Sequence, residues 1–133
     1  MIKSALEQLK EDEGFRGSIY QCTEGKNTIG YGRNLDDNPL TREEAQFLLE
    51  NDLEKVARQA QKFPWYKTLT SERRAVILNM IYNLGINRFK QFKLMIAALY
   101  VEDYELAAKE MLNSKWAKQV KGRALRLSMI MKG

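Results

Sequence analysis

The residues that could do chemistry are gathered in the first third of the chain, around Glu13 and the glycine-rich stretch after it. Three apolar residues precede Glu13 at spacings of four, three and four: Ile2, Leu6 and Leu9. One stripe of a helix would therefore carry three apolar side chains and then a carboxylate, so we expect Glu13 to face inward. Partial burial and the negative end of the helix dipole, just before Gly14, both disfavour a charged carboxylate. A carboxyl group that keeps its proton is what a general acid requires.

A short hairpin is predicted directly after this helix. Residues 18–22 alternate as a strand, and residues 28–32 return antiparallel after a turn that contains glycine. Alternation would place Thr28, Gly30 and Gly32 on one face of the returning strand. Two glycines weaken a strand, so this face indicates a ligand that lies against the backbone.

Beyond the hairpin the pattern predicts helices only. Thr41 and Glu44 form a capping box, so we expect a helix to begin there, to end at residues 63–65 and to link two lobes. A second helix is predicted from about residue 71 to 84, buried at the centre and stopped by Gly85. Four shorter helices are predicted over residues 88–92, 94–99, 104–112 and 121–131.

Large side chains of the helical part are expected to form a core. The second helix carries one apolar face with Ala75, Leu78 and Tyr82 and another with the pairs 76–77 and 80–81. The six methionines are more typical of core filling than of a soft partner-binding surface. The two tryptophans, Trp65 and Trp116, lie beside predicted helix ends and are expected to pack rather than to stack on sugars.

The stretch from Glu13 onwards resembles the phage-type lysozymes of glycoside hydrolase family 24. Their signature, E-G-x-R-x-x-x-Y-x-D-x-x-G-x-x-T-I-G-x-G-H, is matched here except at two positions. Cys22 stands where the family usually has the catalytic aspartate, and Arg33 stands where a histidine commonly follows the last glycine. We expect the change at Arg33 to concern lobe structure and the change at Cys22 to concern the chemistry. The similarity continues through residues 71–85 and 116–126.

The resemblance implies an α+β, mostly helical lysozyme-like fold in a single domain spanning residues 1–133. The expected β-hairpin lobe covers about residues 14–60, and the helical lobe covers about 61–133 plus the N-terminal helix 1–13. The resemblance also implies roles for individual residues. Glu13 takes the position of the general acid, Cys22 that of the second catalytic group, and Thr28 that of the threonine that holds the hydrolytic water. Five further residues are assigned to substrate binding: Tyr20, Glu24, Gly30, Phe92 and Arg123.

Three interpretations of Cys22 stay open. It could act as a working base or nucleophile, it could be tolerated while Glu13 and Thr28 carry the catalysis, or the protein could be an inactive glycan-binding homologue. A thiol with an ordinary pKa of about 8.5 is a few per cent thiolate at neutral pH, so it needs neighbours such as Lys26 or Arg16 to lower its pKa. A retaining or an inverting reaction is compatible with this sequence.

The implied activity is that of a muramidase, which hydrolyses the β-1,4 bond between N-acetylmuramic acid and N-acetylglucosamine in peptidoglycan during phage-induced lysis of the host cell. We expect a monomer without cofactor or metal that is made in the host cytoplasm. It would act on the cell wall in the periplasm after the membrane is permeabilised. The competing class is a non-catalytic wall-binding module. Whether the protein is a free endolysin or part of a virion stays open.

Composition excludes several other mechanisms. The 133 residues contain no histidine and one cysteine, which excludes a Ser-His-Asp triad, a Cys-His pair, a zinc finger and an internal disulfide. The 22 Lys and Arg residues exceed the 17 Asp and Glu residues, which gives a net charge of +5. These basic residues are spread along the chain, so we expect no nucleic-acid partner. No apolar run is long enough for a signal peptide or a membrane span, so we expect no stable membrane association.

Overall fold

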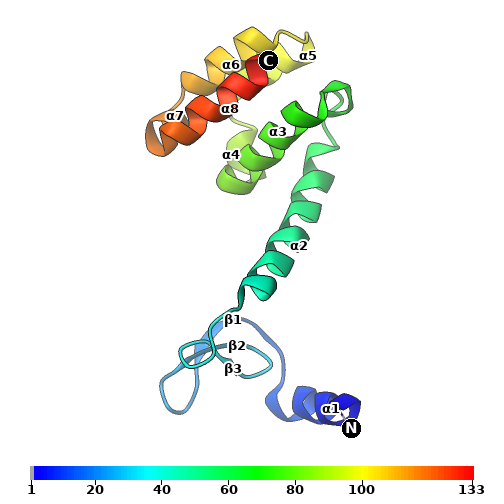
Figure 1. The fold of residues 1–133 in the computed structure, drawn as a ribbon, viewed down its shortest axis with the longest axis vertical. Helices are drawn as coiled ribbons and strands as arrows, with labels where there is room; N and C mark the ends of the chain where they lie inside the picture. Colours follow the sequence, from blue (N-terminus) through cyan, green and yellow to red (C-terminus); the bar gives the residue numbers. More distant parts are fainter. Residues whose placement is uncertain (1) are drawn as a thin grey trace. The chain divides into compact units, whose positions relative to one another are not determined.

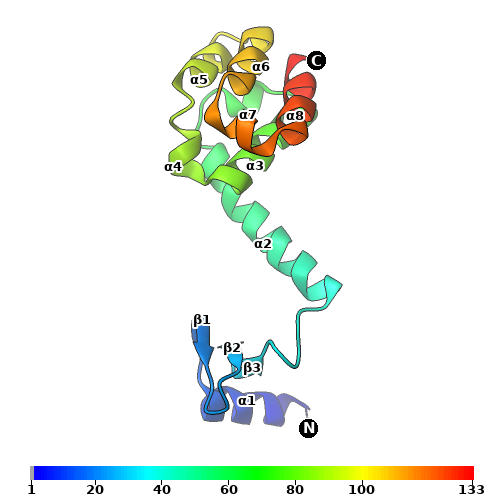
Figure 2. The same ribbon diagram turned by 90° about the vertical axis from the view of Figure 1, so that its left-hand side faces the viewer.

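The structure, a computed structural model, describes residues 2–133 and divides into two compact units, Met1–Phe47 and Leu48–Gly133. Each unit is described by itself (Figures 1 and 2). The first combines a helix with a small sheet and the second is helical, which confirms the predicted α+β class. The assignment of residues 1–13 to the helical lobe stays a prediction, and Met1 lies outside the described residues.

The first unit holds one helix and a three-stranded antiparallel sheet. Helix α1 (Ile2–Glu13) leads into strands β1 (Arg16–Gln21), β2 (Asn27–Gly30) and β3 (Arg33–Asn34), in the spatial order β1-β2-β3. Within this unit, Figure 2 shows the strands next to α1. The sheet is short, so it positions a few side chains at its turns and does not form a large core.

The returning strand differs from its prediction. It ends at Gly30, and the chain turns at Tyr31 and Gly32 into β3, which pairs with β2. Gly30 and Gly32 have φ angles of +71° and +73°, in the left-handed region that favours glycine. The two glycines therefore form a second tight turn. They do not lie along one flat strand face as predicted.

Within the first unit the apolar stripe of α1 is exposed, and the prediction that Glu13 faces inward is not confirmed by this unit alone. Ile2, Leu6 and Leu9 are 87%, 49% and 54% exposed, and Glu13 is exposed as well. Charged residues on the other faces of α1 and the shortness of the three strands explain why the stripe is not covered within this unit. Periodicity predicted the helix correctly, but it could not supply a partner for its apolar face.

Helix α2 (Arg42–Ala60) begins with the predicted capping box. The Thr41 backbone N–H donates to Glu44 Oε1 (2.8 Å), and the Glu44 backbone N–H donates to Thr41 Oγ1 (3.1 Å). Glu44 also accepts two hydrogen bonds from the guanidinium of Arg33, one of them 2.9 Å long. Arg33 donates to the carbonyl oxygens of Asn38 and Pro39 too. The structure thus supports the prediction that Arg33 has a structural role, since it fastens β3 to the start of α2.

The second unit contains the rest of α2, a short 3₁₀ turn and six further helices in its described residues: η1 (Tyr66–Thr68), α3 (Ser71–Leu84), α4 (Ile86–Phe89), α5 (Lys93–Tyr100), α6 (Tyr104–Leu112), α7 (Lys115–Val120) and α8 (Gly122–Lys132). Helix α6 packs against α5 and α8, and α3 packs against α4 and α8. The predicted bounds of α3 and α6 are confirmed, and α7 was not predicted. The boundary between the units lies within α2, at Phe47 and Leu48, and the predicted division of the lobes at about residues 60 and 61 stays a prediction.

The core lies in this second unit, with α3 at its centre. The buried face of α3 carries Val76, Ile77, Met80 and Ile81, whereas Tyr82 is exposed. Four of the five described methionines are buried, and Met129 is the exposed one, which supports the prediction of core filling. Trp65 and Trp116 are each 3% exposed and pack with phenylalanines. Both tryptophans are therefore core residues, as predicted.

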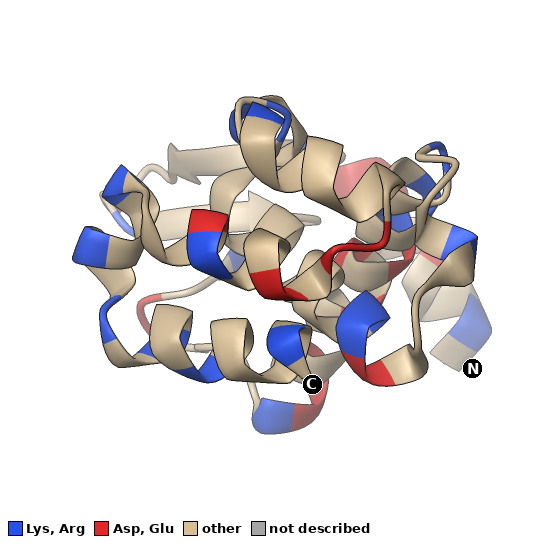
Figure 3. Ribbon diagram, turned by 90° about the horizontal axis from the view of Figure 1, so that it is seen from above, with Lys and Arg blue, Asp and Glu red and all other residues tan. Residues whose placement is uncertain are grey.

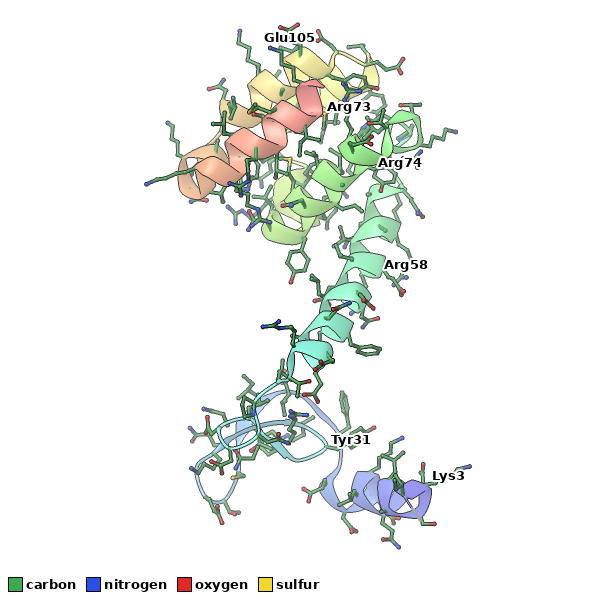
Figure 4. All side chains as sticks on the ribbon, in the orientation of Figure 1. Lys3, Tyr31, Arg58, Arg73, Arg74 and Glu105 are labelled. Carbon is green, nitrogen blue, oxygen red and sulfur yellow. The ribbon has the colours of Figure 1, made fainter. Side chains whose placement is uncertain are left out.

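Hydrogen bonds join α3 to the C-terminal end of α8. The guanidinium of Arg73 on α3, labelled in Figure 4, donates to the carbonyl oxygens of Met131 (2.7 Å) and Lys132 (3.1 Å) at the end of α8. The same guanidinium lies 3.9 Å from the ring centroid of Tyr104. In residues 2–133 no helix is both long and apolar enough to cross a membrane.

Candidate active site

The carboxylate of Glu13 lies against the backbone of Gly32. A β-carbon built on Gly32 would come within 2.7 Å of Glu13 Cδ and 3.1 Å of its Cγ, and it would meet Oε2 as well. Glu13 is the last residue of α1, and Gly32 is in the turn between β2 and β3. The predicted general acid therefore rests on the glycine turn of the sheet.

Contacts on both sides of this pair fix the end of α1 to the turn. The rings of Phe15 and Tyr31 are 5.6 Å apart between centroids, and Lys10 Nζ lies 5.9 Å from the Tyr31 centroid. The Gly14 backbone N–H donates to the Lys10 carbonyl oxygen (3.0 Å), which closes the last turn of the helix. Tyr31, which precedes Gly32 in the turn and is labelled in Figure 4, thus contacts α1 through Lys10.

Cys22 lies half-buried at the first turn of the sheet. Its backbone N–H donates to the Lys26 carbonyl oxygen (3.0 Å), and its own carbonyl oxygen accepts from the Gly25 N–H (2.8 Å). The backbone N–H groups of Glu24 and Lys26 lower the pKa of the Cys22 thiol, and the Thr28 hydroxyl adds to this effect. Partial desolvation and the Glu24 carboxylate oppose the lowering without cancelling it.

The cause of this lowered pKa differs from the predicted one. The charges of Arg16 and Lys26 were expected to stabilise the thiolate, but the turn does so with backbone N–H groups. The Lys26 ammonium lies 3.6 Å from Asp37 Oδ1, and the Arg16 guanidinium lies 4.4 Å from the ring centroid of Tyr20. A cluster of N–H groups that favours an anion is a property of turn conformation. Residue types alone do not reveal it.

Thr28 is buried, with 3% of its surface exposed, and it pairs with Tyr20 across the sheet. Its hydroxyl donates to the Lys26 carbonyl oxygen (2.9 Å). A hydroxyl has one proton to donate and can also accept hydrogen bonds. While that proton is engaged, the Thr28 oxygen is free to accept a hydrogen bond from a water molecule. Thr28 and Cys22 are therefore two parts of one polar cluster.

The remaining predicted residues divide between the two units. Tyr20, Glu24 and Gly30 belong to the sheet of the first unit, where Tyr20 is half-buried and Glu24 is exposed. Phe92 and Arg123 belong to the second unit. The structure thus brings Glu13 to Gly32 and Cys22 to Thr28 within the first unit, and Phe92 and Arg123 have surroundings of their own.

Arg123 is held by α3. Its Nε and Nη2 atoms donate to Asn79 Oδ1 at 3.0 and 2.6 Å, so the amide oxygen accepts both hydrogen bonds. Phe92 lines a pocket of about 350 Å³, whose wall also contains Trp116, Arg88, Lys93 and Glu110. The Phe92 and Trp116 rings meet edge to face with centroids 6.1 Å apart. This pocket combines aromatic surface with charged side chains.

Comparison with known proteins decides the family. The family model for phage lysozyme matches residues 10–130, which include every predicted site residue. The chain belongs to the phage lysozyme family. The match spans far more than half of the chain, so it covers the turn residues of the sheet as well as α3 and α8.

Curated relatives of this phage lysozyme family member include a lysozyme, an endolysin and a phage spike protein. The chain is 29% identical to a probable T4-type lysozyme 1 of Dictyostelium discoideum, over 96% of this chain and 92% of the relative. It is 31% identical to an endolysin of Acyrthosiphon pisum secondary endosymbiont phage 1, over 98% of this chain and 89% of the relative. It is also 31% identical to the pre-baseplate central spike protein Gp5 of Enterobacteria phage T4. There the chain spans 27% of the relative's length.

Sequence reasoning gave one residue of this lysozyme-family site a different role and missed another. Gly32 was predicted to offer space to a ligand, yet in the structure the Glu13 carboxylate is its neighbour. Asn79 was not singled out, although it holds Arg123. Its position on α3, three residues after the buried Val76, could have indicated a polar residue near the core. No group of three or more Cys, Asp and Glu side chains in residues 2–133 is arranged to hold a metal ion.

Proposed function

We propose that this chain is a peptidoglycan hydrolase of the muramidase type, which cleaves the β-1,4 bond between N-acetylmuramic acid and N-acetylglucosamine. The family and the lysozyme and endolysin names of its relatives support a hydrolase of this class. The observation that carries the proposal is the pairing of Glu13 with the sheet turn, close in sequence to a polar cluster with a stabilised thiolate.

The reaction divides between these groups. Glu13 gives its proton to the glycosidic oxygen, the bond from that oxygen to the anomeric carbon breaks, and positive charge develops on the sugar. The Cys22 thiolate stabilises this charge and supplies the second catalytic function. As a base it takes a proton from water, whose oxygen bonds to the anomeric carbon with inversion. As a nucleophile it bonds to that carbon itself, and water later displaces it with net retention.

The other predicted residues support this reaction. Thr28 holds the attacking water through its hydroxyl oxygen, since its proton is donated to the Lys26 carbonyl oxygen. Tyr20, Glu24 and Gly30 contact the glycan from the sheet. We also assign Phe92 and Arg123 to glycan binding, and the aromatic and charged lining of the Phe92 pocket suits a glycan with acidic peptides.

The biological setting follows from the proposed substrate. We place the action of this protein on the cell wall of the bacterial host during lysis, in the periplasm after the membrane is permeabilised. It acts as a monomer and needs no cofactor. Lysine and arginine residues are distributed over many helices and interspersed with acidic ones (Figure 3). That a nucleic acid is not a partner stays a prediction.

The test compares the wild type with Glu13→Gln on purified cell walls. The amide keeps the shape of the side chain but cannot donate the proton, so hydrolysis should fall by about 10²–10⁴-fold while glycan binding remains. A Glu13→Gln protein with more than about a hundredth of the wild-type rate would remove Glu13 as the general acid.

A second function, binding of glycan without hydrolysis, is favoured by the replacement of the usual aspartate by Cys22. An inactive wild type that binds cell walls, and that gains activity on Cys22→Asp substitution, would establish this alternative.

A further inference from the structure

We propose that Gly32 is a positioning residue for the general acid, because the absence of a side chain at residue 32 lets the Glu13 carboxylate rest on the turn. This inference rests on the proposed function of Glu13. It differs from the expectation that the glycines of the sheet leave room for a ligand.

The atoms around Gly32 carry the argument. All three atoms nearest to a β-carbon built there belong to Glu13, and two of them, Cδ and Cγ, would be 2.7 and 3.1 Å away. Real β-carbons essentially never come closer than 3.0 Å to a heavy atom outside their own residue and its two chain neighbours. Any L-residue at position 32 therefore displaces the Glu13 carboxylate, because that flexible side chain yields more easily than the backbone.

Other glycines of the chain do not share this relationship. Gly14, Gly25, Gly30 and Gly85 also have positive φ angles, of 70°, 75°, 71° and 82°, but a β-carbon on any of them would meet no atom within 4 Å. An alanine at any of these positions is strained, because L side chains rarely adopt such φ angles, but its β-carbon has no neighbouring atom to displace. The strain is thus common to the group, whereas the contact with the carboxylate is particular to Gly32.

Proton transfer depends on the position of the acid. A general acid must reach the leaving oxygen within about 2.6–3.2 Å, and a misplacement of about 1 Å can cost about 10²-fold in rate. The Phe15–Tyr31 and Lys10–Tyr31 contacts hold the end of α1 at the turn. With the helix end fixed there, the carboxylate itself must move when a methyl group is added to residue 32.

The experiment compares Gly32→Ala with Gly85→Ala, which introduces backbone strain in the second unit, at a position whose φ of 82° and ψ of 153° are essentially restricted to glycine. We expect Gly32→Ala to lower kcat on cell-wall glycan by about 10²-fold. The dissociation constant for an N-acetylglucosamine oligomer should stay within about twofold of the wild type, and Gly85→Ala should keep wild-type kcat. An equal loss of kcat in both variants, or weaker oligomer binding with unchanged kcat in Gly32→Ala, would overturn the proposal.

A measurement on the wild type makes the test independent of activity and of the folding of the variant. Nuclear Overhauser effects between the Glu13 γ-protons and the Gly32 α-protons are expected, because Glu13 Cγ lies 3.1 Å from the place that a β-carbon would take. Their absence would overturn the positioning role. If they are present and the wild type hydrolyses no cell wall, the proposed function fails while the contact stands.

Discussion

The Thr28 hydroxyl donates to the Lys26 carbonyl oxygen at 2.9 Å, and it also favours the thiolate of Cys22, whose pKa it lowers. One hydroxyl proton cannot serve both acceptors at once. We expect the hydroxyl to turn from the Lys26 oxygen to the sulfur when the thiol ionises, because only a donated hydrogen bond stabilises a thiolate. The charge state of Cys22 is therefore coupled to the rotation of one buried hydroxyl.

Replacing Thr28 by valine should make Cys22 less reactive at neutral pH. Loss of the hydroxyl removes one of the groups that lower the pKa of the thiol, so the thiolate fraction falls. We expect alkylation by iodoacetamide at pH 7 to slow by about 2- to 10-fold. Thr28→Ser, which keeps the hydroxyl, is the matched control. Equal rates in wild type and Thr28→Val would show that the hydroxyl does not stabilise the thiolate.

Substitutions of Cys22 should separate its possible roles. If it is the second catalytic group, Cys22→Ala is severely impaired and Cys22→Asp remains at least as active as the wild type, because a carboxylate is ionised at neutral pH. Product stereochemistry then distinguishes a base, which inverts, from a nucleophile, which retains. A folded but inert Cys22→Asp protein, measured by cell-wall hydrolysis, would argue against a catalytic role at this position.

The pH dependence of stability should change on Glu44→Gln substitution. The Thr41 backbone N–H and then the Arg33 side chain lower the pKa of Glu44 in the folded state. A carboxyl group with a lowered folded pKa stabilises the protein above its unfolded value of about 4.3, and this contribution is lost as pH falls through the folded pKa. Urea unfolding should therefore separate Glu44→Gln from the wild type more at pH 7 than at pH 3.

Glu43→Gln is the control for this comparison, because Glu43 also lies in the first turn of α2 and shares its position on the helix dipole. A difference of equal size at pH 7 and pH 3 in Glu44→Gln would mean that shape, and not the carboxylate charge, accounts for its contribution.

Replacing Asn79 by alanine should destabilise the protein. The half-buried guanidinium of Arg123 donates twice to Asn79 Oδ1, and a buried donor without an acceptor costs about 1–3 kcal/mol. The free energy of unfolding, measured by urea titration, should fall by about that amount. Asn79→Asp, which keeps the acceptor oxygens, should lose less. A loss in Asn79→Asp as large as that in Asn79→Ala would contradict the role of the hydrogen bonds.

Local signals in the sequence predicted local structure well. The Thr41 and Glu44 capping box forms with both hydrogen bonds, and α3 ends at the predicted Gly85 stop. Helix α7 carries the same type of signal, since the Ser114 hydroxyl accepts from the Ala117 N–H, but with six residues it has little periodicity of its own. Caps are readable because both partners lie within three residues of each other.

Features that depend on distant residues were not predictable. The stripe before Glu13 predicted burial, but periodicity does not say whether another element covers a face. Helix α3 has two apolar faces, so its sequence did not predict which of them is buried. In the structure the face with Met80 packs into the core. The lowered pKa of Cys22 comes from backbone N–H groups, and the contact of Gly32 with Glu13 joins residues 19 positions apart. None of these features has a signature in residue types alone.

The Glu44 carboxylate accepts hydrogen bonds from both Thr41 and Arg33, and this affects how the first unit unfolds locally. This group caps α2 through Thr41 and holds β3 through Arg33, so displacement of the carboxylate breaks both sets of hydrogen bonds at once. Amide protons of the first turn of α2 and of Asn34, which pairs with Thr28, should then exchange with solvent deuterium in one cooperative step. The hairpin that carries Cys22 is thereby tied, through Glu44 eleven residues beyond Arg33, to the fraying of the first turn of α2.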